Sequence, residues 1–238
     1  WEPERVAVLW DASGSRQNID RDIAFLEALA ATWRRVAFDV RVLRDVFEPQ
    51  VRSFTVDSGD CSALVTFLRG LAYDGGTNLA GVDLRELPHP DDEGWLLFSD
   101  GLNTVGVGLP ASTSPRIFAI AGQAKSDSTL LGHLADRSGG AHFNLLNTDP
   151  ATAAATIVSW TDALRLERAV GCEDVHVSSS AGRLMIVGRL TQELASVQLS
   201  GPGAPTDQLA IARGTATLGQ NIARIWAGQQ AQLEKLLG

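Results

Sequence analysis

The segment from Val6 to Trp10 restricts the fold more than any other part of this chain, because all of its residues are apolar. Such an uninterrupted run, ended by the polar Asp11, predicts a strand that is buried on both faces of a parallel sheet. Helical spacing of apolar residues follows over residues 18–35. Because open α/β sheets bind ligands beyond the carboxyl ends of their strands, functional side chains are expected directly after the strands.

Strand and helix patterns continue to alternate along the first two thirds of the chain. This order predicts right-handed crossovers and a parallel sheet with helices on both faces. We therefore expect an α/β fold over residues 1–165, with a doubly wound, mostly parallel and Rossmann-like sheet of six strands. The other expected strands are residues 38–43, 51–56 (at a sheet edge), 95–98, 116–121 and 141–145, and the other expected helices are residues 61–72, 79–84, 128–137 and 149–165.

The pattern changes from Gly171 onward. Short, partly alternating segments separated by Gly, Ser and Pro predict antiparallel strands with tight turns, one of them at residues 180–182. An amphipathic helix is expected over residues 221–237. We therefore divide the chain into residues 1–165 and an extension, residues 166–238, in which the expected strands are residues 175–177, 183–190, 195–199 and 208–212.

The overall composition excludes several classes of function. The net charge is −8 and no segment is rich in Lys or Arg, which argues against a nucleic-acid partner. No apolar run approaches the ~18–20 residues that span a membrane. The two cysteines, Cys61 and Cys172, are interpreted as free thiols, with one disulfide between them as the alternative. Because the chain begins with Trp1, we expect it to be a piece of a longer polypeptide.

Three separate loops place hydroxyl and carboxylate groups near the ends of expected strands. Asp11, Ser13 and Ser15 follow the first strand, Thr77 lies in a Gly-Gly-Thr-Asn loop, and Asp100 follows the strand over residues 95–98. Oxygen atoms of this kind are the ligands that Mg²⁺ prefers. Each group alone is more often a helix cap than a metal ligand, so the prediction depends on the three loops meeting.

The pattern Asp-x-Ser-x-Ser, Gly-Gly-Thr-Asn and strand-Ser-Asp-Gly resembles the metal-ion-dependent adhesion site of von Willebrand factor type A domains. The resemblance implies that Asp11, Ser13, Ser15, Thr77 and Asp100 surround Mg²⁺ or Mn²⁺. It also implies that the two aspartates act mainly through bound waters and hydrogen bonds, and that an acidic side chain of a partner protein completes the metal shell. The protein would then be a binding module for adhesion or assembly, without catalysis.

The end of the chain, with Ala-Arg-Ile-Trp-Ala followed by Glu-Lys-Leu-Leu, is similar to the segment after the A domain in inter-α-trypsin-inhibitor heavy-chain-like proteins. This narrower resemblance implies a location outside the cytoplasm, in the periplasm, on the cell surface or in the secreted fraction. Arg16 departs from the family, in which many members carry methionine at this position. A cation there would either favour acidic partners or lower the affinity for the metal.

Two other functions remain open at this stage. Asp11 at a strand end is also the position of the nucleophile in phosphate hydrolases of the haloacid-dehalogenase type. Those enzymes need a second acid two residues later, where this chain has Ser13. The other alternative is a structural module whose contacts do not depend on metal.

Overall fold

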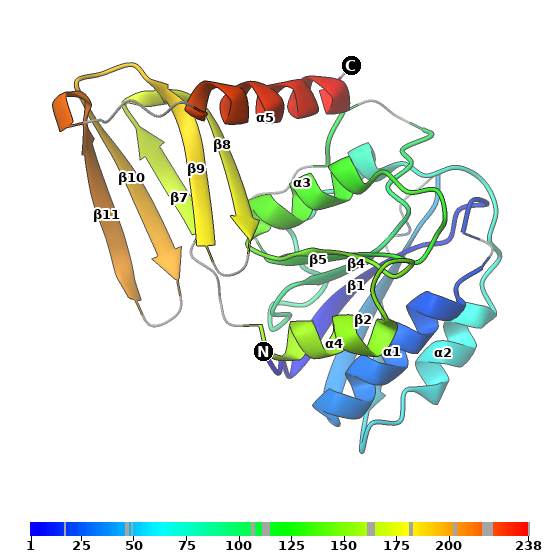
Figure 1. Cartoon of the computed structure of the whole chain (residues 1–238). Coiled ribbons are helices and arrows are strands. Elements are labelled where there is room, and N and C mark those ends of the chain that lie inside the picture. Colours follow the sequence, from blue (N-terminus) through cyan, green and yellow to red (C-terminus); the bar gives the residue numbers. More distant parts are fainter. Residues whose placement is uncertain are drawn as a thin grey trace. The chain divides into compact units, whose positions relative to one another are not determined.

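The computed structural model describes residues 1–16, 18–45, 48, 50–105, 108–110, 115–160, 165–180, 183–201, 204–215 and 221–237. The chain forms two compact units, Trp1–Trp160 and Thr161–Gly238, which we describe separately. The first unit is a sheet with helices on both faces, and the second contains antiparallel strands and the C-terminal helix (Figure 1).

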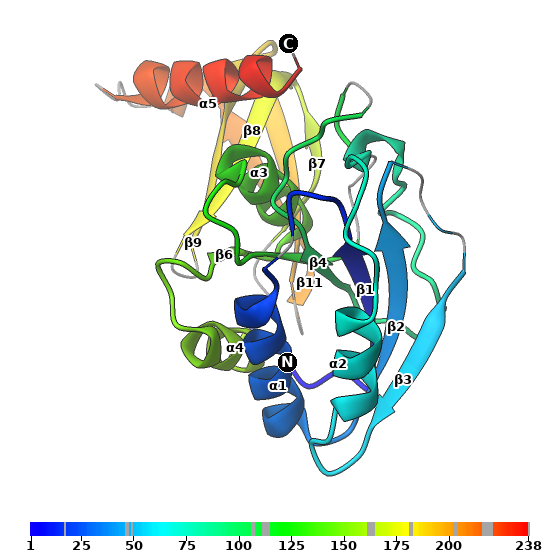
Figure 2. The ribbon, with the colours of Figure 1, turned by 90° about the vertical axis from the view of Figure 1, so that its right-hand side faces the viewer.

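The first unit is built on a six-stranded sheet in the order β3-β2-β1-β4-β5-β6. All neighbouring strands pair in parallel except β3, which pairs antiparallel with β2 at the edge of the sheet (Figure 2). The expected α/β fold is therefore confirmed, including the edge strand. The strands are β1 (Arg5–Asp11), β2 (Val36–Leu43), β3 (Arg52–Val56), β4 (Trp95–Phe98), β5 (Ile117–Ala121) and β6 (His142–Asn144).

The helices form two layers, one on each face of this sheet. Helices α1 (Asp20–Trp33), α2 (Ser62–Arg69) and α4 (Pro150–Val158) cover one face, and α3 (Ser128–Ser138) covers the other. Only a short 3₁₀ turn, η1 (Leu79–Gly81), forms where a helix over residues 79–84 was expected. Because both faces are covered, Val6 to Asp11 of β1 are all buried.

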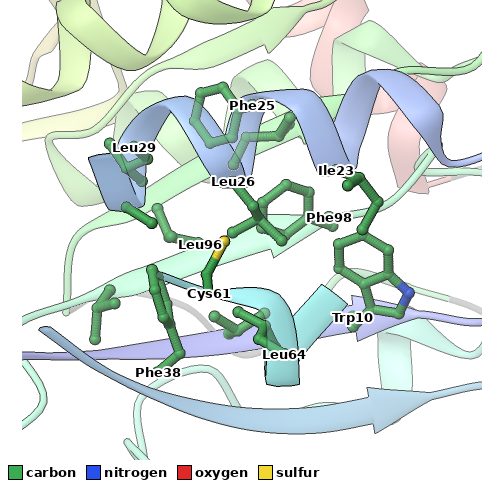
Figure 3. Close-up of a cluster of buried hydrophobic side chains, with 14 of the residues drawn as sticks. Trp10, Ile23, Phe25, Leu26, Leu29, Phe38, Cys61, Leu64, Leu96 and Phe98 are labelled. Atoms are coloured by element: carbon green, nitrogen blue, oxygen red, sulfur yellow. The ribbon is translucent and has the colours of Figure 1, made fainter. Parts of the chain in front are cut away.

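A hydrophobic core lies between the sheet and helices α1, α2 and α4. Alternate residues of a strand point to opposite faces, so Val8 and Trp10 of β1 enter this core while Leu9 faces the α3 side. Figure 3 shows Trp10 next to Phe98 of β4, with their ring centroids 4.8 Å apart. Each large apolar side chain buried in this way contributes roughly 2–3 kcal/mol. The packing therefore holds the carboxyl ends of β1 and β4 side by side.

The expectation of a helix that continues to residue 165 is wrong. Helix α4 ends at Val158, and residues 161–164 lie outside the described part of the chain. Arg165 is already the first residue of a strand, β7 (Arg165–Val170), whose backbone pairs with β10 (Leu194–Gly201). The start of α4 agrees with the sequence pattern, since the Asp149 side chain accepts from the Thr152 amide and Pro150 occupies the first turn.

The described residues of the second unit form five strands, one more than expected. Three form the sheet β11-β10-β7, and two form the separate sheet β8-β9, all antiparallel. Residues 181 and 182 of the expected tight turn lie outside the described residues. Helix α5 (Ile222–Leu237) agrees with the expected C-terminal helix, and its Trp226 indole donates to the Asp174 carbonyl. The remaining elements are β8 (Cys172–Ser180), β9 (Arg183–Leu190), β11 (Ala204–Ala212) and the 3₁₀ turn η2 (Arg213–Thr215).

Two further expectations concern cysteines and membranes. Cys61 and Cys172 are both free thiols, as the first of the two interpretations proposed. Among the helices in the described part of the chain, none combines the length and the apolar character needed to cross a bilayer.

A buried pair of acidic side chains lies toward the amino end of the sheet, away from the expected site. Asp39 of β2 accepts from the Arg5 guanidinium and the Ser53 hydroxyl. Asp92 is also buried, and its Oδ2 accepts from the His89 amide at 2.8 Å. Burial, together with the charge and hydrogen bonding of Asp39, raises the pKa of Asp92 to about 7, although the His89 amide and Arg5 oppose the shift.

This arrangement predicts that Asp92→Asn removes a pH dependence of stability. Because the folded chain holds the Asp92 proton more tightly than the unfolded chain, the native protein loses stability as pH rises from about 4 to about 7, by up to about 4 kcal/mol. The asparagine variant mimics the protonated acid, so its advantage over the native chain grows through this range and is constant above it. Urea unfolding at pH 4.5, 6 and 8.5 measures the difference.

Asp91→Asn is the matched control, because the Asp91 side chain is 76% exposed. It is expected to leave the pH profile of the native chain unchanged. If the free energies of unfolding of the native and Asp92→Asn proteins change with pH in parallel, Asp92 has the same pKa in the folded and unfolded chains and the prediction is wrong.

Candidate metal centre

Four of the five residues expected to surround a metal lie at or directly after the carboxyl ends of β1 and β4. The fifth, Thr77, lies in a loop that is hydrogen-bonded to the loop after β1. Asp11 is the last residue of β1, and Asp100 follows β4 by two residues. These strands are neighbours, and Trp10 pairs with Phe98 in register. Asp11 therefore lies next to the segment that carries Ser99 and Asp100.

Backbone hydrogen bonds join the loop that carries Thr77 to the loop after β1. The Asp74 amide donates to the Ala12 carbonyl and the Gly14 amide donates to the Gly75 carbonyl, both at 3.1 Å. As a result, Thr77 Oγ1 lies 3.4 Å from Asp11 Oδ2 and 3.5 Å from Asp11 Oδ1. In the same loop as Asp11, the hydroxyl oxygens of Ser13 and Ser15 are 3.1 Å apart.

The Asp11 carboxylate organises this cluster. Its Oδ1 accepts from the Ser13 amide at 2.9 Å and its Oδ2 accepts from the Ser99 hydroxyl at 2.7 Å. Ser99 also accepts from the Gly101 amide, so it connects Asp11 with the turn after β4. Ser99 belongs to the Ser-Asp-Gly part of the sequence pattern but was not among the predicted site residues, although its place directly after a buried strand is a signal for such a role.

The Asp100 carboxylate has one oxygen with a partner and one without. Oδ1 accepts from the Leu102 amide at 2.9 Å, whereas Oδ2 is buried and has no hydrogen-bond partner in the described residues. Burial raises the pKa of Asp100, while the nearby Ser15 hydroxyl, the Leu102 amide and Arg16 lower it and Asp11 raises it further. A buried carboxylate oxygen without a partner is costly, so this side chain is suited to an added cation or water.

Four of the five residues of the cluster are buried, and one is exposed. Asp11, Ser13, Thr77 and Asp100 are each at most 1% exposed, whereas Ser15 is exposed. The chain after Asp100 covers Thr77, because the Thr104 hydroxyl accepts from the Thr77 amide at 2.9 Å and the amides of Thr104 and Val105 donate to the Thr77 carbonyl. Ser15 is therefore the member of the cluster whose side chain lies at the protein surface.

The sequence suggested a cation at the rim of the metal site, where Arg16 would favour acidic partners or lower the affinity for the metal. In the structure Arg16 does not lie at the rim. Its side chain is fully buried beneath the loop. Nη1 donates to the Asp11 and Phe98 carbonyls, both at 2.6 Å, and the guanidinium lies 4.9 Å from the centre of the Trp10 ring. Arg16 therefore joins the last residues of β1 and β4, and its side chain is not available to a partner protein.

Asp22 of α1 is the counter-ion of Arg16. Its Oδ2 accepts from Arg16 Nη2 at 2.7 Å, and both side chains are fully buried. Gln123 Nε2 lies 3.4 Å from the same oxygen and donates to the Asn18 carbonyl at 2.6 Å. A Cβ at Gly122 would lie 2.7 Å from Asp22 Oδ1, so glycine makes room for the carboxylate. Burial raises the pKa of Asp22, and Arg16 opposes the shift.

The donor set determines which ions are compatible with this cluster. Within the described residues, no group of three or more His, Cys, Asp or Glu side chains is arranged to hold a metal. The cluster offers hydroxyl oxygens and two carboxylates, a set that suits a hard cation with several bound waters, as Mg²⁺ has, and is unsuitable for Zn²⁺. The unpartnered Asp100 oxygen and the paired serine hydroxyls fit such an ion.

Comparisons with known proteins bear on the fold. No family model matches the sequence, and no curated protein matches it. Among solved structures, von Willebrand factor type A from Catenulispora acidiphila aligns with a TM-score of 0.53 and 14% identity, over 96% of this chain and 72% of that chain.

Two further matches have lower scores. An aerotolerance-related membrane protein from Bacteroides fragilis NCTC 9343, with multiple mutations to serines, has a TM-score of 0.48 and 13% identity, over 65% of this chain and 96% of that chain. Proximal thread matrix protein 1 from the mussel byssus has a TM-score of 0.42 and 15% identity, over 66% of this chain and 47% of that chain. The Catenulispora match and the sheet order together show that this chain has the fold of a von Willebrand factor type A domain.

Proposed function

We propose that this protein is a binding module that holds a divalent cation, Mg²⁺ or Mn²⁺, and uses it to bind an acidic side chain of a partner protein. The observation that carries the proposal is the convergence of hydroxyl and carboxylate oxygens from three loops around Asp11. The second support is the buried Oδ2 of Asp100, which has no hydrogen-bond partner among the described residues and could accept a cation or a bound water.

The residues divide into two roles in this proposal. The hydroxyls of Ser13, Ser15 and Thr77 bind the cation directly. Thr77 donates its proton toward Asp11, which leaves the lone pairs of its oxygen for the metal. Asp11 and Asp100 supply the negative charge, through hydrogen bonds and bound waters.

A bound cation would supply the attachment point for a carboxylate from outside. The chain carries a net charge of −8, so an acidic partner is repelled by the protein as a whole when no metal is present. The cation would neutralise the two site carboxylates and offer an open coordination position on the side of the exposed Ser15. Binding of the partner is therefore expected to depend strongly on the metal.

The surroundings of Asp11 favour binding over phosphate transfer. A nucleophilic carboxylate needs an oxygen that can reach the substrate, but Asp11 is fully buried. Both of its oxygens already accept hydrogen bonds, from the Ser13 amide and the Ser99 hydroxyl. A hydrolase would have to break these contacts before each reaction.

We also retain the narrower resemblance to inter-α-trypsin-inhibitor heavy-chain-like proteins as part of the proposal. It rests on the sequence at the end of the chain, which forms helix α5. It implies a place outside the cytoplasm and a role in adhesion or assembly.

Removing one hydroxyl from the cluster is the direct test of metal binding. Titration of the full chain with Mn²⁺ by isothermal calorimetry is expected to show one site. Thr77→Val keeps the shape of the side chain but removes its oxygen, and is expected to weaken Mn²⁺ binding by about 10- to 100-fold. Thr156→Val is the matched control, because the Thr156 hydroxyl donates to the Thr152 carbonyl on the exposed side of α4.

The partner is tested separately. Immobilised chain with Mg²⁺ is expected to retain a protein that is released by EDTA and is not retained by Thr77→Val. Retention that survives EDTA and the substitution would favour a structural module independent of metal, and a native chain that binds no Mn²⁺ would refute the proposal. Hydrolysis of a phosphate ester that Asp11→Asn abolishes would favour the enzyme.

A further inference from the structure

The buried ion pair beneath the cluster changes the charge that a cation would meet. Arg16 Nη1 lies 2.6 Å from the backbone oxygen of Asp11, the residue whose side chain organises the proposed metal site. It lies equally close to the oxygen of Phe98, two residues before Asp100. A guanidinium is always protonated, so a full positive charge lies against the backbone segments that carry the two site carboxylates.

Asp22 cancels this charge. Without it, the two site carboxylates and Arg16 together carry one negative charge, which is a poor match for a divalent cation. With Asp22 in contact with Arg16 at 2.7 Å, the pair is neutral and the site retains two negative charges. Because all four side chains are buried, water screens these charges much less than it would at the surface.

The surroundings of Asp22 hold its carboxylate in this place. Gln123 connects Asp22 with the Asn18 carbonyl, and the missing side chain of Gly122 leaves room for Oδ1. Arg16 in turn is held against the backbone oxygens of Asp11 and Phe98, so its positive charge lies next to the two segments that carry the site carboxylates.

We propose that Asp22 is an affinity-determining residue of the metal site, which acts by neutralising Arg16 without touching the metal. The inference rests on the proposed function, because it concerns the affinity of that same site for a divalent cation. A purely structural role of the pair, joining the ends of β1 and β4, makes a different prediction. In that case loss of either partner would distort the loops and weaken metal binding alike.

Mn²⁺ alone is the probe, and its affinity is measured by isothermal calorimetry for the native chain, Asp22→Asn, Arg16→Gln and the double variant. Asp22→Asn leaves the positive charge uncompensated and is expected to bind Mn²⁺ about tenfold more weakly or worse. Arg16→Gln and the double variant remove that charge and are expected to bind as tightly as the native chain, to within about threefold, or more tightly.

Asp39→Asn is the matched control for loss of a buried, ion-paired aspartate. Asp39 pairs in register with Ala7, four residues before Asp11 and so about 13 Å away along β1. It is expected to bind Mn²⁺ like the native chain. Near-ultraviolet circular dichroism shows which variants are folded. If Asp22→Asn does not fold, the Mn²⁺ affinity of Arg16→Gln distinguishes the two roles. A structural role of the pair predicts a weaker affinity for this variant, whereas the electrostatic role predicts an unchanged or tighter one.

The outcomes separate the two proposals. A native chain that binds no Mn²⁺ overturns the proposed function and this inference with it. A native chain that binds while folded Asp22→Asn binds equally well overturns only the role of Asp22. Equal weakening in Asp22→Asn, Arg16→Gln and the double variant also overturns it, in favour of a structural pair.

Discussion

Arg16→Met is expected to lower the free energy of unfolding by about 3–5 kcal/mol, the usual cost of breaking a buried ion pair on one side. The substitution leaves Asp22 buried without its counter-ion. It also removes the donor shared by the Asp11 and Phe98 carbonyls. Urea unfolding followed by circular dichroism measures the loss.

Two comparisons show whether burial is the cause. Arg16→Met combined with Asp22→Leu removes both charges and is expected to recover most of the stability, since apolar replacements of buried pairs are often neutral or stabilising. Arg35→Met breaks an exposed pair, in which Arg35 and Asp57 are 85% and 75% exposed, and is expected to cost less than about 1 kcal/mol. If Arg16→Met costs no more than Arg35→Met, the buried pair does not stabilise the fold.

Gly140→Ala is expected to destabilise the first unit by about 3 kcal/mol or more. Gly140 lies between α3 and β6, and a Cβ there would lie 1.9 Å from the Ile117 carbonyl oxygen at the start of β5. Both positions are buried backbone, so no flexible side chain can move aside. The turn or β5 has to shift, which disturbs a strand that pairs with β4.

Gly132→Ala is the opposite case on the neighbouring helix. Apart from its chain neighbours and the backbone of α3 itself, no described atom lies within 4 Å of a Cβ at Gly132, which is inside α3. Alanine is the better helix former, so this change is expected to raise stability by about 0.5–1 kcal/mol. Thermal or urea unfolding of the two variants gives shifts of opposite sign, and equal shifts would contradict the steric argument.

The sequence pattern predicted the elements of the first unit well, because local features decide them. Val6 to Trp10 contains no polar residue, and a strand of that kind is stable only when both faces are covered. The start of α4 was also predictable, since Asp149 and Pro150 form a capped first turn. The end of α4 was not, because Arg165 belongs to a strand whose partner, Ser200, is 35 residues away. Long-range pairing overrides local periodicity there.

The candidate site shows the same division. The chain order and residue types of Asp11, Thr77 and Asp100 are visible in the sequence, and they suggested the cluster. Ser99 and Asp22 were missed. Asp22 follows Asp20 and Arg21 at the start of a helix, a pattern typical of a solvated first turn. Only the burial of α1 against the ends of β1 and β4 makes it the counter-ion of Arg16.

The sequence by itself determined the α/β class, the edge strand and the residues that carry oxygen donors, because hydrophobic periodicity and residue type act locally. The tertiary structure alone decided that β1 and β4 are neighbours, which brings Asp11 next to Ser99. It also decided that Arg16 turns inward and meets Asp22. The physical reason is that charge and distance between residues far apart in the chain depend on strand order and burial, and neither is encoded in any single segment.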